Sequence, residues 1–88
     1  MGRVEAELLT DGGNNAVVRL PGRRFVGLLI QGDSLSTLRS DLAEVVEAFD
    51  QGDGAGLAKT AGLLLADLYA LLMRYSAALD AHEIPRPY

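Results

Sequence analysis

The sequence has no cysteine, no tryptophan, a single histidine and a single lysine among its 88 residues. Without cysteine there is no disulfide framework, no thiolate nucleophile and no cysteine-ligated zinc site. With one histidine, a transition-metal site would depend on carboxylates. We therefore predict no catalytic site, no cofactor and no metal centre. A chain this short must be stabilised by its own packing or by a second copy of itself.

Basic charge is also scarce, with 8 Lys and Arg against 12 Asp and Glu and a net charge of −4. Residues 34–54 hold one arginine and five acidic residues, so they account for the whole excess, while the segments on either side are balanced. Phosphate backbones are bound by clustered basic residues, so we expect no nucleic-acid partner. The first residues lack the apolar run of a secretory signal, and we expect a cytoplasmic location.

The first third of the chain has the pattern of three short strands. Apolar and polar residues alternate over residues 3–10, and the run Asp11-Gly12-Gly13-Asn14-Asn15 is typical of a turn. Residues 16–20 form a second candidate strand that ends at Pro21-Gly22, and residues 25–31 form a third. This pattern predicts a three-stranded antiparallel sheet.

Residues 34–50 change to the three-and-four spacing of a helix, and Ser34 or Asp33 can cap its first turn. Its apolar stripe predicts a helix that lies on the sheet. The opposite side carries an acidic face, which we regard either as a surface for a protein partner or as a solvated flank that keeps the chain soluble. The acidic face consists of Asp41, Glu44, Glu47 and Asp50.

A second helix is predicted over residues 56–82, and its apolar arc of about 200° is wider than one sheet can cover. Large apolar residues lie beside a ridge of small residues spaced by four, and such a ridge lets two helices approach closely. We predict a homo-oligomer with this seam as its interface. The candidate interface consists of Ala58, Gly62, Ala66, Ala70, Tyr69 and Met73. The apolar run 60–73 is short for a bilayer and contains Asp67, so we expect no membrane span.

Together these elements predict an α+β fold of the order β-β-β-α-α, in a single domain covering residues 1–88 with an extended tail at 83–88. The second helix is expected to supply a large share of the core.

Two short motifs resemble known sites. Gly32-Asp33-Ser34-Leu35 resembles the opening motif of the GDSL serine esterases, in which the serine is the nucleophile, and Asp80-Ala81-His82 is similar to the family's acid–base pair. A capping role for Ser34 explains the same residues. The run 52–60 resembles a phosphate-binding loop, but its lysine does not directly follow the final glycine, and we predict a turn between helices.

The first half also resembles the HicB-type antitoxin domain. The resemblance covers residues 4–49 and consists of the Asp-Gly-Gly turn, the Leu20-Pro21-Gly22 break, the strand residues 27–31 and Gly32-Asp33-Ser34-Leu35 before a helix. It implies a sheet with a helix on one face and a non-catalytic, protein-binding role. The chain as a whole looks like the short bacterial single-domain families of unknown function.

Three functional hypotheses follow from the sequence. The first is a non-enzymatic, self-associating module for protein interaction. The second is an antitoxin or immunity protein that neutralises a partner toxin by direct binding, with the acidic face against a basic surface. The third is a small GDSL-like serine esterase that uses Ser34.

Overall fold

The structure, a computed structural model, describes residues 2–3, 5–11, 13 and 15–88. It has three strands, β1 (Glu7–Leu8), β2 (Val17–Arg19) and β3 (Gly27–Leu28), followed by two helices, α1 (Gly32–Asp50) and α2 (Gly54–Ala81). The predicted α+β fold with the order β-β-β-α-α is therefore confirmed. The chain divides into a sheet unit, residues 1–31 with 72–88, and a hairpin unit, residues 32–71.

The sheet is antiparallel with the order β1-β2-β3. Glu7 pairs with Arg19, and Val17 pairs with Leu28. The regular ladders are shorter than the predicted strands 3–10, 16–20 and 25–31, because each ladder pairs only a few facing residues. The predicted turn at Pro21-Gly22 is present, with Gly22 at a φ of 74°. Of the predicted strand and turn residues, Val4, Gly12 and Asn14 lie outside the described residues.

The core of the sheet unit forms where the sheet meets the C-terminal end of α2. It consists of Leu9, Val17 and Val26 from the sheet segment and Ala78 and Leu79 from the helix. Leu79 is 1% exposed, and Val17 is fully buried. The end of α2 therefore covers this face of the sheet, and the placement of helix 34–50 on the sheet stays a prediction.

The helices contribute less to the core than their sequences predict. None of the residues of α1 is buried. The buried residues of α2 are Ser76, Ala78 and Leu79, so the long leucine face that precedes them stays outside the core. The second helix supplies core residues as predicted, but only from its last two turns.

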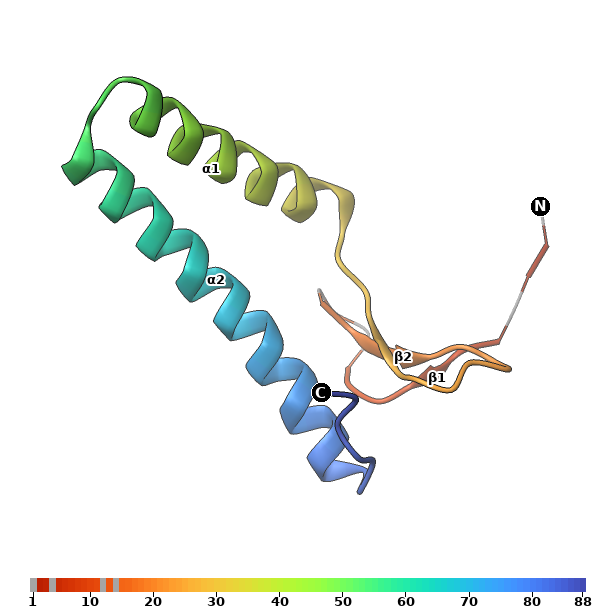
Figure 1. Cartoon of the computed structure of the whole chain (residues 1–88). Coiled ribbons are helices and arrows are strands. Elements are labelled where there is room, and N and C mark those ends of the chain that lie inside the picture. Colours follow the sequence, from red (N-terminus) through yellow and green to blue (C-terminus); the bar gives the residue numbers. More distant parts are fainter. Residues whose placement is uncertain (1, 4, 12, 14) are drawn as a thin grey trace. The chain divides into compact units, whose positions relative to one another are not determined.

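In the hairpin unit, α1 and the first part of α2 run antiparallel (Figure 1). Half-buried side chains on both helices follow a three-and-four spacing, which marks a single seam. They include Leu38, Val45 and Ala48 on α1 and Leu57, Ala61 and Leu64 on α2.

The connection between the helices is a capped turn, as predicted for this glycine-rich run. Gly52 has a φ of 71°, a left-handed conformation that suits glycine at a helix end. The N–H of Asp53 donates to the Ala48 carbonyl at 2.9 Å, which closes the end of α1. The Asp53 carboxylate then accepts the N–H of Gly56 at 2.9 Å and caps α2. The carboxylate and glycines of this turn thus have structural roles.

We predict that Leu79→Ala lowers the free energy of unfolding of the sheet unit by about 2–5 kcal/mol, because it leaves a cavity in a closed core. Leu8→Ala, at a position that is 49% exposed, should cost much less. Urea unfolding followed through the amide signal of Val17 measures the free energy of unfolding of both variants. Equal losses in the two variants would contradict this assignment of the core.

Candidate functional site

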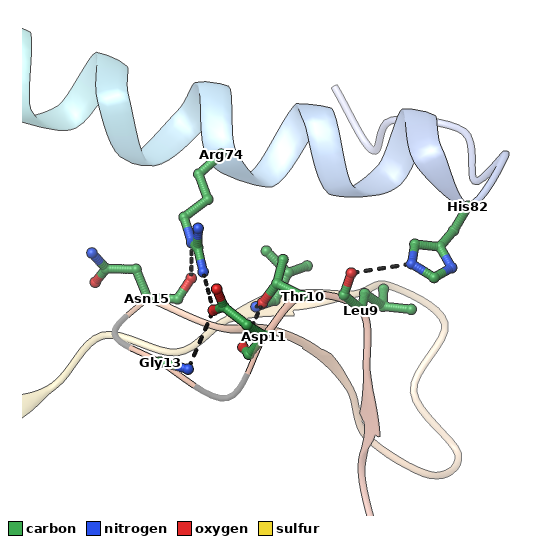
Figure 2. A network of polar contacts seen from close by, with 8 residues as sticks. Leu9, Thr10, Asp11, Gly13, Asn15, Arg74 and His82 are labelled. Atoms are coloured by element: carbon green, nitrogen blue, oxygen red, sulfur yellow. Dashed lines mark hydrogen bonds and ion pairs between the residues drawn. The ribbon is translucent and has the colours of Figure 1, made fainter.

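A polar network in the sheet unit attaches α2 to the turn between β1 and β2 (Figure 2). Arg74 donates from Nε to the Asn15 carbonyl at 2.8 Å and from Nη2 to the Asp11 carboxylate at 3.0 Å. The same carboxylate accepts the N–H of Gly13, and the Thr10 hydroxyl accepts the N–H of Val17 at 3.1 Å. Arg74 therefore fixes the helix against a turn that carries Asn15 at a positive φ.

The residues of the esterase hypothesis take part in separate contacts. His82 donates from Nε2 to the Leu9 carbonyl at 3.1 Å, as Figure 2 shows, while Asp80 pairs with Arg86 at 2.8 Å. Ser34 belongs to the hairpin unit, where the Asp33 carboxylate accepts its N–H at 2.8 Å. Because Asp80 and His82 bind these different partners, no acid–base pair is assembled from them in the described part of the sheet unit.

The C-terminal tail folds back on the last turns of α2. Ile84 donates its N–H to the Leu79 carbonyl at 2.9 Å. The preceding residue, Glu83, has a φ of 55° and is the left-handed residue that ends the helix. Farther along, the Tyr88 hydroxyl forms a hydrogen bond with the buried Ser76. The predicted extended tail is thus held against the helix by backbone and side-chain contacts.

This arrangement creates a groove of about 330 Å³ in the sheet unit. Its walls come from the segment before β3, from the end of α2 and from the tail, and they combine apolar side chains with two guanidinium groups. They include Arg24, Phe25, Tyr75, Leu79, Ile84 and Arg86. Sequence analysis missed this site, because its residues are far apart in the chain and none belongs to a motif.

The two arginines of the groove have different surroundings. Arg86 pairs with Asp80, and this hydrogen bond raises the pKa of Arg86 above its usual value. Arg24 lies over the Phe25 ring, 5.3 Å from its centroid. This geometry is that of a cation–π contact. Among the described residues, no carboxylate forms an ion pair with Arg24. The groove thus offers one guanidinium that is free to bind an anion.

Tyr75 lines the groove and has a shifted pKa. Its hydroxyl donates to the Val26 carbonyl at 2.6 Å. Burial raises the pKa of Tyr75 above its ordinary value, and the neighbouring Tyr88 adds to the shift. The protonated phenol is therefore the form that supports the fold.

The hairpin unit exposes large apolar side chains on both helices. Eight of its leucine, valine, phenylalanine and tyrosine residues are about half exposed or more. They are Leu35, Leu42, Val46 and Phe49 on α1 and Leu63, Leu65, Leu68 and Tyr69 on α2. An extensive apolar surface of this kind is typical of an interaction site rather than of scattered exposure.

The predicted interface residues of α2 are accessible. Ala58, Gly62, Ala66 and Ala70 are exposed, and so are Tyr69 and Met73. A Cβ added at Gly62 would meet no atom within 4 Å. Their role as an interface stays a prediction.

The acidic face is also accessible over most of its length. Glu44, Glu47 and Asp50 are exposed, while Asp41 is half-buried. Glu47 accepts a hydrogen bond from the Gln51 amide at 3.3 Å, a contact at the same helix end. The hairpin unit as a whole carries two basic and seven acidic residues, a net charge of −5.

Two remaining possibilities are metal binding and membrane binding. Across the part of the chain that the structure describes, no group of three or more His, Asp or Glu side chains could hold a metal ion. By length and composition alone, α2 could cross a membrane, with a mean hydropathy of 1.4 over its most apolar window. None of that window is buried, and one such helix does not by itself decide between a membrane and a protein as its cover. The expectation of no membrane span stays a prediction.

Comparison with known proteins assigns the chain to a family by its full length, since the profile of the family of unknown function DUF6959 matches residues 1–88. The chain belongs to DUF6959. A search of curated proteins found no match. A search of solved structures found none either. Membership in DUF6959 supports one domain over the chain, and the resemblance to HicB-type antitoxins stays a hypothesis.

The Tyr75 phenol predicts a loss of stability at high pH. Because its folded-state pKa lies above the unfolded value of about 10, its contribution is complete below about pH 10 and is lost as the pH rises through the folded value. Urea unfolding between pH 7 and 11 should show this loss in the wild type and in Tyr69→Phe, but a weaker one in Tyr75→Phe. An identical alkaline decline in all three would show that Tyr75 has no such role.

Proposed function

We propose that this DUF6959 chain is a non-enzymatic, self-associating interaction module, in which the hairpin unit of a second copy covers the exposed apolar surface of the first. The observation that carries the proposal is the hairpin unit itself. It has two amphipathic helices, eight large apolar side chains about half exposed or more, and no buried residue.

The physical reason is that two helices share only one seam. In the hairpin unit that seam leaves its best residues half-buried, so the remaining apolar side chains stay in contact with water. Covering the exposed half of one such side chain contributes roughly 1 kcal/mol. Four helices can surround a common core, and two hairpins supply four helices. A second copy therefore supplies the cover that the hairpin unit by itself lacks.

Gly62 supports the choice of α2 as the seam. A glycine inside a helix costs about 1 kcal/mol relative to alanine. At this position a methyl group would meet nothing in the same chain. Packing against another helix explains a glycine here, because the absence of a side chain lets two helix backbones approach closely. The neighbouring Ala58 and Ala66 extend the same surface by four residues in each direction.

A membrane is a less suitable cover for this surface than a second copy. Asp67 lies in the middle of the apolar run of α2. A carboxylate at the centre of a bilayer costs about 2.5–3.5 kcal/mol even on permissive scales. The last turns of α2 also pack on the sheet through Ala78 and Leu79. A protein surface covers the leucines while Asp67 and Lys59 stay in water.

The second candidate is the antitoxin or immunity protein, in which the cover is a partner toxin rather than a second copy. The exposed carboxylates of Glu44, Glu47 and Asp50 favour a basic partner surface. The two candidates differ in what is bound. A specific toxin would form a heteromer in place of the homodimer, and a mixture of the purified components would show it by mass.

The test is the mass of the purified chain by sedimentation velocity between 1 and about 500 µM, with two glutamine variants of α2. The wild type should have twice the 9.4 kDa chain mass. Leu65→Gln changes a side chain that is 69% exposed in the single chain. In a symmetric dimer it removes apolar contacts twice and should raise the dissociation constant roughly 100-fold.

Lys59→Gln is the matched control, because it introduces the same amide on the polar side of the same helix and should leave the constant within about threefold. A wild type that stays at the single-chain mass throughout would overturn the proposal. Flotation of the monomeric chain with phosphatidylcholine vesicles would favour the membrane in its place.

A further inference from the structure

The groove of the sheet unit is chemically complementary to one segment of the hairpin unit. It combines the free guanidinium of Arg24 with the ring of Phe25 and apolar walls that include Leu79 and Ile84. Its volume of about 330 Å³ suits a single large side chain with its charged neighbours. Such a volume is at the lower end of the range for ligand sites. An occupant of this groove should be apolar and anionic.

The C-terminal end of α1 has those two properties. Phe49 is 71% exposed, more than any other large apolar side chain described, and the acidic residues Glu47 and Asp50 lie beside it. Carboxylates at the C-terminal end of a helix oppose its dipole, and the last turn of α1 has no basic residue. This acidic end is therefore unfavourable in the isolated chain and would be stabilised by an external cation.

The net charges of the two units also favour this contact. The hairpin unit has a net charge of −5, while the sheet unit has six basic and five acidic residues and a net charge of +1. Two hairpin units repel each other when they associate. Contact between a hairpin unit and a sheet unit offsets part of that repulsion.

We assign the occupant to a second copy, because the proposed self-association brings two chains together and a hairpin unit and a sheet unit have opposite net charges. In an antiparallel pair of α2 helices, the start of one lies beside the end of the other. A symmetric dimer then forms the contact twice and leaves no open end.

We propose that Phe49 and Asp50 at the end of α1 dock in the groove of a second copy, with Asp50 paired to Arg24. The inference rests on the proposed self-association and adds an antiparallel geometry and a specific contact to it. It assigns to the groove an occupant from the same protein.

The test is a charge exchange measured by sedimentation velocity at about 150 mM salt. Arg24→Glu places two acidic groups together in both contacts of the dimer, and Asp50→Arg places two basic groups together there. Each variant alone should raise the dissociation constant at least tenfold. A mixture of the two should form a heterodimer of higher affinity than either variant alone, because one of its two contacts pairs the introduced glutamate with the introduced arginine and the other keeps the native Arg24 and Asp50.

Arg23→Glu is the matched control, since it makes the same charge change one residue away at an exposed position outside the groove. Melting curves by circular dichroism establish that each variant is folded, and Asp50→Arg gives an independent test if Arg24→Glu is not. Both positions are exposed in the single chain.

The outcomes separate this inference from the proposed function. If the wild type dimerises but Arg24→Glu dimerises as tightly as Arg23→Glu, or the mixture shows no recovery, the groove contact is wrong and self-association stands. If the affinity recovers when Arg24→Glu and Asp50→Arg are combined in one chain but not in the mixture of single variants, the contact lies within a chain and the inference is overturned. A monomeric wild type would overturn both.

Discussion

Two amphipathic helices joined by a tight turn can bury only the side chains between them, and this limit governs the rest of the account. In the hairpin unit, the seam residues Leu38, Val45 and Leu64 are half-buried, while a second set of apolar residues lies outside the seam. The hairpin unit itself has no further element to cover that set, and the proposed association supplies one. The sheet unit is built on the opposite principle, with Leu79 and Val17 closed inside a small core.

Local signals in the sequence predicted most of the fold. The helix ends lie within two residues of the predicted ranges 34–50 and 56–82, because apolar periodicity and the capping carboxylates Asp33 and Asp53 are local. The strand lengths were overestimated, because a ladder depends on pairing between distant segments and not on alternation alone. The placement of helix 34–50 on the sheet stays a prediction, since an apolar stripe shows that a face needs cover but not which surface covers it.

The candidate sites divide in the same way. The small-residue ridge of α2 and the acidic face of α1 could be identified from spacing, and both are largely accessible in the structure. The groove could not be identified from spacing, because Arg24, Tyr75 and Arg86 come together only when the sheet, the helix end and the tail have packed. The motif that resembles an esterase had a local signal, yet Asp80 and His82 take part in separate structural contacts.

Amide hydrogen exchange at two protein concentrations tests the central claim most directly, because it reports on each helix separately. Protection at residues 35–49 and 57–71 should rise steeply between about 1 µM and 500 µM, while protection at Val17 and Leu79 should change little. Strong protection of the hairpin unit that is independent of concentration would contradict the account, because it would show that one chain satisfies its own apolar surface.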